Sequence, residues 1–358
     1  AREAWQGRLA KAPQKAELER RLAGDLPAGL GDAVAAYKAE LTAKPQTVAT
    51  RKASEMALEV VTKVAHEMIG GSADLTGSNN TRTKPMVDIQ AGTYGGTYVR
   101  WGVREHAMAA AMNGMALHGG VIPFGGTFLV FTDYCRPAIR LAALMEQRVI
   151  FVMTHDSIGL GEDGPTHQPV EHLAALRAIP NLNVFRPADV VETVECWLLA
   201  LEARHTPSVI ALTRQNLPQV RRGDEPGNPS SRGAYVLREA DGAYRATILA
   251  TGSEVEIALA AREALQKDGI PTRVVSMPSW ELFRRQDAAY RASILDCTKA
   301  LVAVEAASGF GWAEMTGGHG RFVGMAGFGA SAPAGKLYRH FGITAEAVAA
   351  AVKADLKD

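Results

Sequence analysis

The stretch THDSIGLGEDGPTHQP, from Thr154 to Pro169, concentrates side chains that can bind polar molecules and move protons. Imidazole and carboxyl groups can donate, accept or carry protons, and the stretch supplies both kinds in His155, Asp163 and His167. Its glycines let the backbone pass close to a bound molecule, and they are Gly159, Gly161 and Gly164. The composition therefore indicates a binding or catalytic loop, with a self-satisfied polar loop as the structural alternative.

Zinc ligation by His155, Asp163 and His167 is a further interpretation of the same stretch. Structural and catalytic zinc sites usually carry recognisable spacings, such as HExxH or paired CxxC. Neither spacing accompanies these three residues, so the sequence favours direct contact with an organic ligand.

The elements around this stretch predict where it lies. A run typical of a β-strand, Arg148 to Met153, leads into it, and a helix-like pattern from Val170 to Ile179 leads out. The stretch is therefore expected to be the loop that leaves the carboxyl end of a parallel strand. Open α/β sheets bind their ligands at that edge. Another strand, Val209 to Thr213, ends in Arg214, where a cation could meet an acidic ligand.

Glu105 is a second candidate for proton transfer. It follows a short predicted strand, Tyr98 to Trp101, and opens an Ala- and Met-rich helix that runs to about Leu117. A helix so apolar is expected to be packed on several sides. The Glu105 carboxylate is then either neutralised by Arg104 or another cation, or kept with a raised pKa for proton transfer.

Three aromatic residues follow the predicted strand from Val121 to Phe124. Phe128, Phe131 and Tyr134 are spaced i, i+3 and i+6 on a helix that is expected to begin after Gly125–Gly126. The spacing places their rings on neighbouring faces of that helix. The three rings form either part of the core or the wall of a cofactor pocket.

The amino-terminal part of the chain predicts short helices followed by a longer one. Residues 1–44 alternate charged residues with Ala and Leu and are broken by Pro and Gly, which indicates helices without a core of their own. Thr47 opens a second helical run whose apolar stripe continues to Met68 and stops at Gly70–Gly71. The polar residues from Ser72 to Asn79 then read as a surface loop.

The remainder predicts a completed first domain, a linker and a second α/β domain. A strand is expected at 184–186, and Asp189 is expected to cap a helix that runs to Ala203. Residues 218–231 are rich in Pro, Gly and Ser and read as a linker. Beyond it we expect strands near 234–237, 247–250, 273–276 and 301–304, with helices from Ser253, around Gln286 and from Thr344. Thr251–Gly252–Ser253 either cradles an anion or supplies Ser253 as a helix cap.

The fold class that follows is α/β, with two consecutive doubly wound, mostly parallel sheets that carry helices on both faces, preceded by a helical arm. The expected boundaries are 1–46 for the arm, 47–217 and 232–358 for the domains, and 218–231 for the linker.

Composition excludes some classes of partner. The chain has 358 residues, 47% of them hydrophobic, and a net charge of +1, so neither nucleic acid nor a membrane surface is expected to bind it. The cysteines form no metal or redox spacing, which favours a reducing cytoplasm, and they are Cys135, Cys196 and Cys297.

The motifs together resemble the transketolase family. They cover the chain from about Arg51 onward, in the family's order and approximate spacing, and they are GGSADLTGSN, GVREHAM, HGGVIPFGGTFLVFTDY, THDSIGLGEDGPTHQP, LTRQNLP and ILATGSEV. The resemblance implies the cofactor thiamine diphosphate. It also implies transfer of a two-carbon ketol unit from a ketose phosphate to an aldose phosphate in the pentose phosphate pathway.

The resemblance assigns roles to residues that match the family's motifs. Glu105 matches the glutamate that hydrogen-bonds the pyrimidine ring of the cofactor, and the aromatic residues match the pocket around that ring. Asp74 matches an aspartate near the thiazolium and the donor sugar. Asp163 and His167 match residues that bind sugar hydroxyls, with His167 beside the reacting end of the donor. The residues that match the set holding the terminal phosphate of the substrate are Arg51, Ser78, His155 and Arg214.

One family feature is absent from the sequence. Transketolases of the usual length bind the diphosphate through Mg²⁺ (or Ca²⁺) with an amino-terminal domain that carries a Gly-Asp-Gly motif, and this sequence contains no Gly-Asp-Gly. The resemblance therefore implies half of an active site, belonging to a fragment or to one subunit of a split enzyme. The expected partner is a second copy of the chain or a complementing diphosphate-binding chain. The alternatives are a non-catalytic dimerisation or regulatory module and a related ketol transferase such as dihydroxyacetone synthase.

Overall fold

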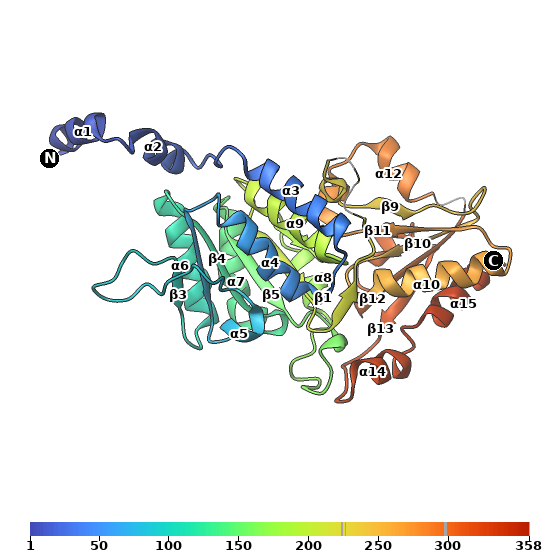
Figure 1. Ribbon diagram of the computed structural model, residues 1–358. Coiled ribbons are helices and arrows are strands. Elements are labelled where there is room, and N and C mark those ends of the chain that lie inside the picture. Colours follow the sequence, from blue (N-terminus) through green and yellow to red (C-terminus); the bar gives the residue numbers. More distant parts are fainter. Residues whose placement is uncertain (223–224, 226, 297–298, 358) are drawn as a thin grey trace.

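The computed structural model describes the whole chain except residues 223–224, 226, 297–298 and 358. It contains two parallel-type sheets side by side, each flanked by helices, which confirms the predicted fold class (Figure 1). Cys297 and part of the predicted linker lie outside the described residues. No helix in the described ranges is long and apolar enough to cross a membrane.

The first sheet has six strands in the order β3-β2-β4-β5-β7-β6, and every pairing is parallel. The strands are β2 (Met68–Ser72), β3 (Tyr98–Arg100), β4 (Ile122–Phe128), β5 (Ile150–Thr154), β6 (Asn183–Phe185) and β7 (Ser208–Leu212). Because all strands run the same way, their carboxyl ends meet at one edge of the sheet.

Helices cover both faces of this sheet, because successive side chains of a strand point to opposite faces. Ile150 and Val152 of β5 pack with α3 (Leu30–Ala43), α4 (Thr50–Val61) and α9 (Val190–Glu202). Phe151 and Met153 pack with α6 (Glu105–His118), α7 (Thr132–Leu144) and α8 (His172–Arg177). Asp189 caps α9 as predicted, since its carboxylate accepts hydrogen bonds from the amides of Val191 and Glu192.

The second sheet has five strands in the order β13-β12-β10-β11-β9, and β9 is antiparallel to β11. The strands are β9 (Tyr235–Arg238), β10 (Ala246–Ala250), β11 (Thr272–Ser276), β12 (Ala300–Ser308) and β13 (Arg321–Met325). One face packs with α10 (Glu254–Lys267), α14 (Ala334–His340) and α15 (Ala345–Asp355). The other packs with α11 (Trp280–Arg284), α12 (Ala288–Ile294) and α13 (Trp312–Met315).

The amino-terminal arm is shorter than the sequence predicts. Helices α1 (Arg2–Lys11) and α2 (Lys15–Ala23) bury no residue, and Figure 1 shows them running away from the rest of the molecule. Helix α3 instead buries Leu30, Val34 and Leu41 against α4 and α9, so it belongs to the core of the first domain. The prediction of a coreless arm to residue 44 is wrong for α3.

Three other predictions need correction. The helix expected to reach Met68 ends at Val61, and Met68–Ser72 forms β2, because parallel neighbours on both sides pair with this glycine-containing segment. Gln286 lies between α11 and α12 rather than inside one helix. The segment after β2 is not only a loop, since α5 (Thr76–Asn79) forms there and buries Asn79.

Candidate active site

The candidate site residues lie at the carboxyl ends of neighbouring strands of the six-stranded sheet. In the sheet order, β2, β4, β5 and β7 are adjacent. Asp74 follows β2, Phe128 ends β4, His155 follows β5 and Arg214 follows β7. For His155 and Arg214 this is the edge that the sequence predicts, and parallel α/β sheets bind ligands there.

A small antiparallel sheet brings Arg51 and Arg214 together, and sequence reasoning missed it. Strand β1 (Thr47–Ala49) pairs with β8 (Asn216–Pro218), so that Ala49 faces Asn216. The start of α4, which carries Arg51, and the end of β7, which precedes Arg214, lie at the same end of this strand pair. There the backbone amide of Thr50 donates to the hydroxyl of Thr213 (2.9 Å).

The two arginines are close enough to influence each other. Arg51 donates from Nη1 to the backbone carbonyl of Ser78 (2.8 Å). Burial, and after it the nearby Arg214 guanidinium, lowers the pKa of Arg51 below its usual value. Among the described residues, no carboxylate forms an ion pair with Arg51 or Arg214. Two guanidinium groups held near one another in this way are suited to a dianionic group such as a phosphate monoester.

His155 lies buried between these arginines and the aromatic residues. Its ring stacks on Phe128 with the ring centroids 3.7 Å apart, and its backbone is left-handed with φ 62°. Burial, followed by the charges of Arg51 and Arg214, lowers the pKa of His155 to about 3. The imidazole is therefore neutral near neutral pH, and it contributes hydrogen bonds rather than charge.

A chain of hydrogen bonds reaches the ring of His155. The Ser72 hydroxyl donates to Asn79 Oδ1 (2.9 Å), and Asn79 Nδ2 donates to Thr154 Oγ1 (2.7 Å). The Thr154 oxygen lies 2.8 Å from His155 Nδ1, at hydrogen-bond distance. In the tautomer in which the Thr154 hydroxyl donates this bond, Nε2 of His155 carries the proton and can donate to a ligand.

The aromatic residues form one cluster, although they do not come from one helix. Phe128 ends β4, Phe131 ends the 3₁₀ helix η1 (Leu129–Phe131), and Tyr134 lies in α7, because β4 continues four residues beyond its predicted end at Phe124. Phe128 and Phe131 are stacked, with centroids 5.6 Å apart and planes 8° from parallel. The His167 ring packs edge-to-face with Phe128 and Phe131, with centroid distances of 6.0 and 5.6 Å. Tyr134 continues the cluster at 5.9 Å from Phe131.

Glu105 starts α6, and only 9% of its surface is exposed. Arg104 donates to the backbone carbonyl of Trp101 (3.1 Å), and no ion pair to Glu105 occurs among the described residues. The alternative in which Arg104 neutralises Glu105 is therefore not supported. Burial, with a smaller effect of Glu105, raises the pKa of Cys135 in α7 to about 12, so the carboxylate lies near the helix that carries Tyr134.

Asp74 and Asp163 are exposed, and neither has a described contact with the aromatic cluster or with the arginines. The zinc interpretation of His155, Asp163 and His167 is not supported either. In the part of the chain that is described, the acidic and histidine side chains whose ligand atoms lie within 4.8 Å of one another are Asp133, Glu171 and His172. There His172 Nε2 lies 3.2 Å from Asp133 Oδ2, which forms an ion pair when the imidazole is protonated.

Residues 154–169 form a loop that we call the central loop, and its glycines serve contacts within the protein. A Cβ on Gly159 would lie 2.2 Å from Nε2 of Gln215, so this glycine makes room for a side chain of the same domain rather than for a ligand. Gly161 and Gly164 have φ of 93° and 80°, which glycine adopts without strain. The expectation that all three glycines face a ligand is wrong for Gly159.

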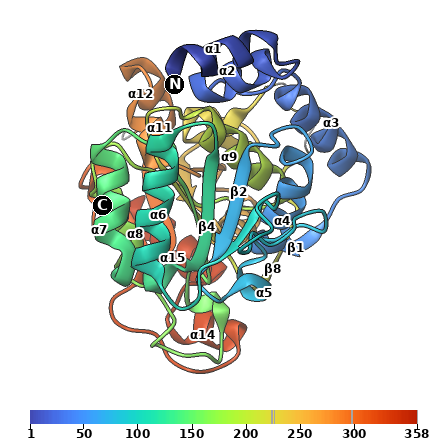
Figure 2. The same cartoon turned by 90° about the vertical axis from the view of Figure 1, so that its left-hand side faces the viewer.

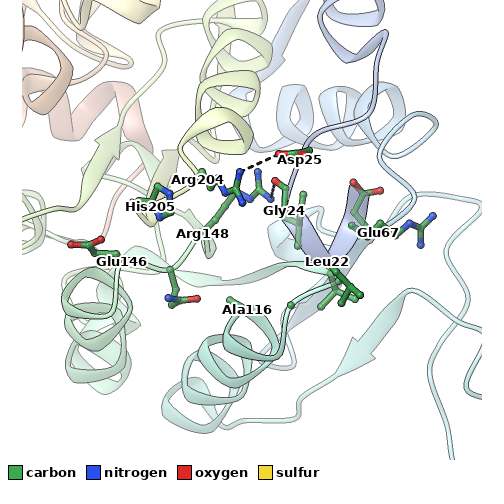
Figure 3. A pocket seen from close by; sticks show the side chains of 15 residues that line it. Leu22, Gly24, Asp25, Glu67, Ala116, Glu146, Arg148, Arg204 and His205 are labelled. Carbon is green, nitrogen blue, oxygen red and sulfur yellow. Dashed lines mark hydrogen bonds and ion pairs between the residues drawn. The ribbon is translucent and has the colours of Figure 1, made fainter. Parts of the chain in front are cut away.

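A cavity of about 180 Å³ lies at the opposite edge of the same sheet, between α2 and the amino ends of the strands. Figure 3 shows Arg148 and Arg204 pointing toward Gly24 and Asp25 at the end of the arm. Arg204 pairs with Asp25 (3.1 Å), and Arg148 donates to the carbonyl of Gly24 (2.8 Å). Both arginines therefore bind the arm, and the cavity lies away from the carboxyl edge of the sheet.

Two family models match the chain. The description "Transketolase, pyrimidine binding domain" matches residues 46–220, and "Transketolase-like TK C-terminal domain" matches residues 233–344. A transketolase from Sinorhizobium medicae (strain WSM419) is 59% identical over 351 residues, covering 98% of this chain and 50% of that protein. The chain thus spans about half the length of the curated relatives it matches.

Solved structures agree with these matches. A transketolase from Pichia stipitis in complex with sedoheptulose 7-phosphate has a TM-score of 0.90 and 42% identity, covering 99% of this chain and 53% of that chain. A chain described as a split gene transketolase in an inactive beta4 tetramer has a TM-score of 0.71 and 28% identity. That similarity covers 87% of this chain and 99% of the other.

Proposed function

The chain belongs to the transketolase family, and we propose that it carries the pyrimidine-binding and sugar-phosphate-binding half of a thiamine diphosphate-dependent transketolase. The reaction moves a two-carbon ketol unit from a ketose phosphate, such as xylulose 5-phosphate, to an aldose phosphate, such as ribose 5-phosphate, in the pentose phosphate pathway. The observation that carries the proposal is the meeting of Arg51, Arg214 and neutral His155 beside the stacked aromatic rings at the carboxyl edge of the sheet.

Each group at this edge suits one part of a sugar phosphate. Arg51 and Arg214 neutralise the phosphate, and the Nε2–H of His155 donates to it, with Ser78 beside them. Asp163 and His167 bind sugar hydroxyls, and His167, held against Phe128 and Phe131, lies by the reacting end of the donor. The relative from Pichia stipitis was solved with a sugar phosphate, which supports this substrate class.

The residues also fit the pyrimidine ring of thiamine diphosphate. Parallel rings of Phe128 and Phe131, extended by Tyr134, offer an apolar wall for a flat heterocycle. Glu105 offers a mostly buried carboxylate that has no cation partner within the described part of the chain, and it can hold or accept a proton at a ring nitrogen. Asp74 would contact the thiazolium or the donor sugar. The cofactor supplies the electron sink of the reaction.

A diphosphate-binding domain completes the site in this proposal, either joined to the same polypeptide or as a separate chain. That domain would hold Mg²⁺ or Ca²⁺ with the diphosphate, because the motif for it is absent from these residues. The similar split gene chain, of nearly the same extent, is described as inactive in its beta4 tetramer. By itself this chain is accordingly expected to be inactive.

An exposed apolar face supports a partner, which is a second copy of the chain or the diphosphate-binding domain. Figure 2 shows α6 and α7 on the side toward the viewer. The sequence predicts α6 to be packed on several sides, yet Leu117 of α6 and Leu141 and Leu144 of α7 are exposed. An uncovered patch of this kind on two neighbouring helices is typical of an interface.

The proposal keeps the predicted pyrimidine-binding domain 47–217, linker 218–231 and C-terminal domain 232–358. Of the predicted arm 1–46, helix α3 packs on the first domain and is counted with it. It also places the protein in the cytoplasm. Cys135 and Cys196 are unpaired and buried, which suits a reducing compartment.

Replacing Glu105 by Gln in the complete enzyme tests the proposal. The substitution keeps the shape and removes the charge and the proton acceptor, so turnover should fall by about 100-fold or more. The melting temperature should change little, because Glu105 has no ion pair to lose among the described residues. Glu146→Gln, at an exposed glutamate, is the matched control and should leave both quantities unchanged. Unchanged turnover in Glu105→Gln would remove Glu105 from the mechanism.

A further inference from the structure

The C-terminal domain contacts the central loop at several points. Gln168 Nε2 donates to the carbonyl of Gly161 (3.0 Å) and, across the domains, to that of Ala330 (2.9 Å). The hydroxyl of Ser331 donates to the carbonyl of Glu162. In Figures 1 and 2 the loop lies beside α14, which contacts the 3₁₀ helix η2 (Ile158–Leu160) within the loop. No sequence motif predicted these contacts.

Arg186 connects the start of this loop to the C-terminal domain. It follows β6 and is 0% exposed. Its Nε donates to Asp156 Oδ2 (2.9 Å), and its Nη1 donates to the carbonyl of Thr251 (2.9 Å) and to the carboxylate of Glu254. One guanidinium therefore bonds both to the residue that follows His155 and to the amino end of α10.

The turn Thr251–Gly252–Ser253 surrounds this cation. The amide of Gly252 donates to the carbonyl of Arg186 (3.0 Å), and a Cβ on Gly252 would lie 2.8 Å from Arg186 Cγ. The anion-cradle interpretation of this turn is wrong, because an arginine fills it. Ser253 precedes α10, but it makes no capping hydrogen bond and donates instead to Glu254 Oε1 (2.7 Å).

The charges around Arg186 are buried and interdependent. Arg186 faces Asp156 and Glu254, and Glu305 lies 3.7 Å away and forms a two-pronged pair with Arg177 (2.8 Å each). Burial raises the pKa of Asp156 above its usual value even beside Arg186. Two guanidinium groups therefore serve three carboxyl groups, and losing one partner leaves another charge poorly compensated in a dry site.

We propose that Arg186, held by Glu254, is a positioning residue for phosphate binding, through which docking of the C-terminal domain sets the place of His155. Asp156 directly follows His155, and His155 has a left-handed backbone that neighbouring contacts must maintain. Fixing Asp156 fixes that backbone and keeps the His155 ring stacked on Phe128, next to the arginines. The inference rests on the proposed function, and it gives the C-terminal domain a part in substrate recognition.

Glu254→Gln tests this role in the complete enzyme. It removes one charge from Arg186 at nearly constant volume. The KM for xylulose 5-phosphate should rise roughly tenfold, while the KM for unphosphorylated xylulose and kcat change little. Tyr338→Phe is the milder second variant, since it removes only a hydroxyl that donates to Glu254 Oε1 (2.8 Å), and it should shift the same KM in the same direction by less. Equal effects on both sugars in both variants would overturn the proposal.

Hydrogen exchange on the 358-residue chain tests the same link without activity. Amides of residues 155–168 should exchange roughly tenfold faster in Glu254→Gln, while those of α4 keep their rates. Glu263→Gln, at an exposed glutamate of the same helix, is the control and should leave the loop unchanged. A loop that exchanges at the wild-type rate in Glu254→Gln would overturn the positioning role, whatever reaction the complete enzyme performs.

Discussion

In the proposed phosphate site, His155 differs from Arg51 and Arg214 because it brings no charge. Its pKa of about 3 follows first from burial and then from two neighbouring arginines. In that proposal Arg51 and Arg214 would meet the negative charge of the phosphate, and the neutral imidazole would supply a directed hydrogen bond from Nε2. A protonated His155 would add a third positive charge to a site that already holds two.

In NMR spectra of the chain, the His155 ring should stay neutral from pH 8 to pH 5, whereas in the urea-unfolded chain the same ring should titrate near the ordinary value of about 6.5. Between about pH 6.5 and 3 the unfolded chain binds this proton and the folded chain does not. Its contribution to stability is therefore complete above pH 6.5 and is lost as the pH falls toward 3.

The variant His155→Asn separates this effect from other acid sensitivity. It should lose less unfolding free energy than the wild type between pH 6.5 and 4.5, measured by urea titration at each pH. A His155 signal that titrates near pH 6.5 in the folded chain would contradict the buried, neutral assignment.

At the scale of elements, the turn before α10 is set by Arg186. Gly252 and Gly269 both have left-handed backbones, with φ of 58° and 73°. An alanine at Gly269 meets nothing within 4 Å, whereas at Gly252 its Cβ would press on Arg186. Gly269→Ala should therefore cost about 1 kcal/mol of backbone strain, and Gly252→Ala should cost about 1–3 kcal/mol more because the arginine must move.

Urea unfolding of the two variants beside the wild type measures the difference in free energy. Because both substitutions add the same methyl group at a left-handed position, the comparison isolates the contact with Arg186. Equal losses in the two variants would show that the turn does not depend on that contact.

Elements that carry their own local signals were predictable, and those formed by distant pairing were not. The apolar run of β5 and the Asp189 cap of α9 are local, and both predictions are confirmed. Strand β2 reads as the end of a helix because Val64 and Met68 continue an apolar stripe, and only its pairing with β3 and β4 makes it a strand. The small sheet of β1 and β8 was not predicted either, because it also forms by the pairing of distant segments.

The candidate site shows the same limit. Family motifs pointed to each residue, and the predicted parallel sheet placed His155 and Arg214 at the carboxyl ends of strands, whereas Asp74 was expected in a surface loop and Phe128 on a helix. The spacing within the sequence could not place Arg51 beside Arg214, since that contact depends on strands more than 160 residues apart in register, such as Ala49 with Asn216. The contact of Thr251–Gly252–Ser253 with Arg186 could not be predicted either, because Arg186 lies in the other domain.

At the scale of the whole molecule, the two sheets form one working unit in this account. The first carries the proposed phosphate and pyrimidine sites at its carboxyl edge. The second contacts the central loop through bonds to Arg186 and Gln168 and from Ser331. The face of α6 and α7 is exposed and is the proposed partner surface. We therefore propose half of a transketolase site on this chain.

Ketol transfer from xylulose 5-phosphate to ribose 5-phosphate, with thiamine diphosphate and Mg²⁺ present, tests that claim most directly. The chain of 358 residues is assayed alone and after addition of a transketolase diphosphate-binding domain. We expect no transfer by the chain alone and transfer once that domain is added, with the Glu105→Gln chain slower by about 100-fold or more in the second mixture. Transfer by the chain alone, or silence that persists when the domain binds, would contradict it.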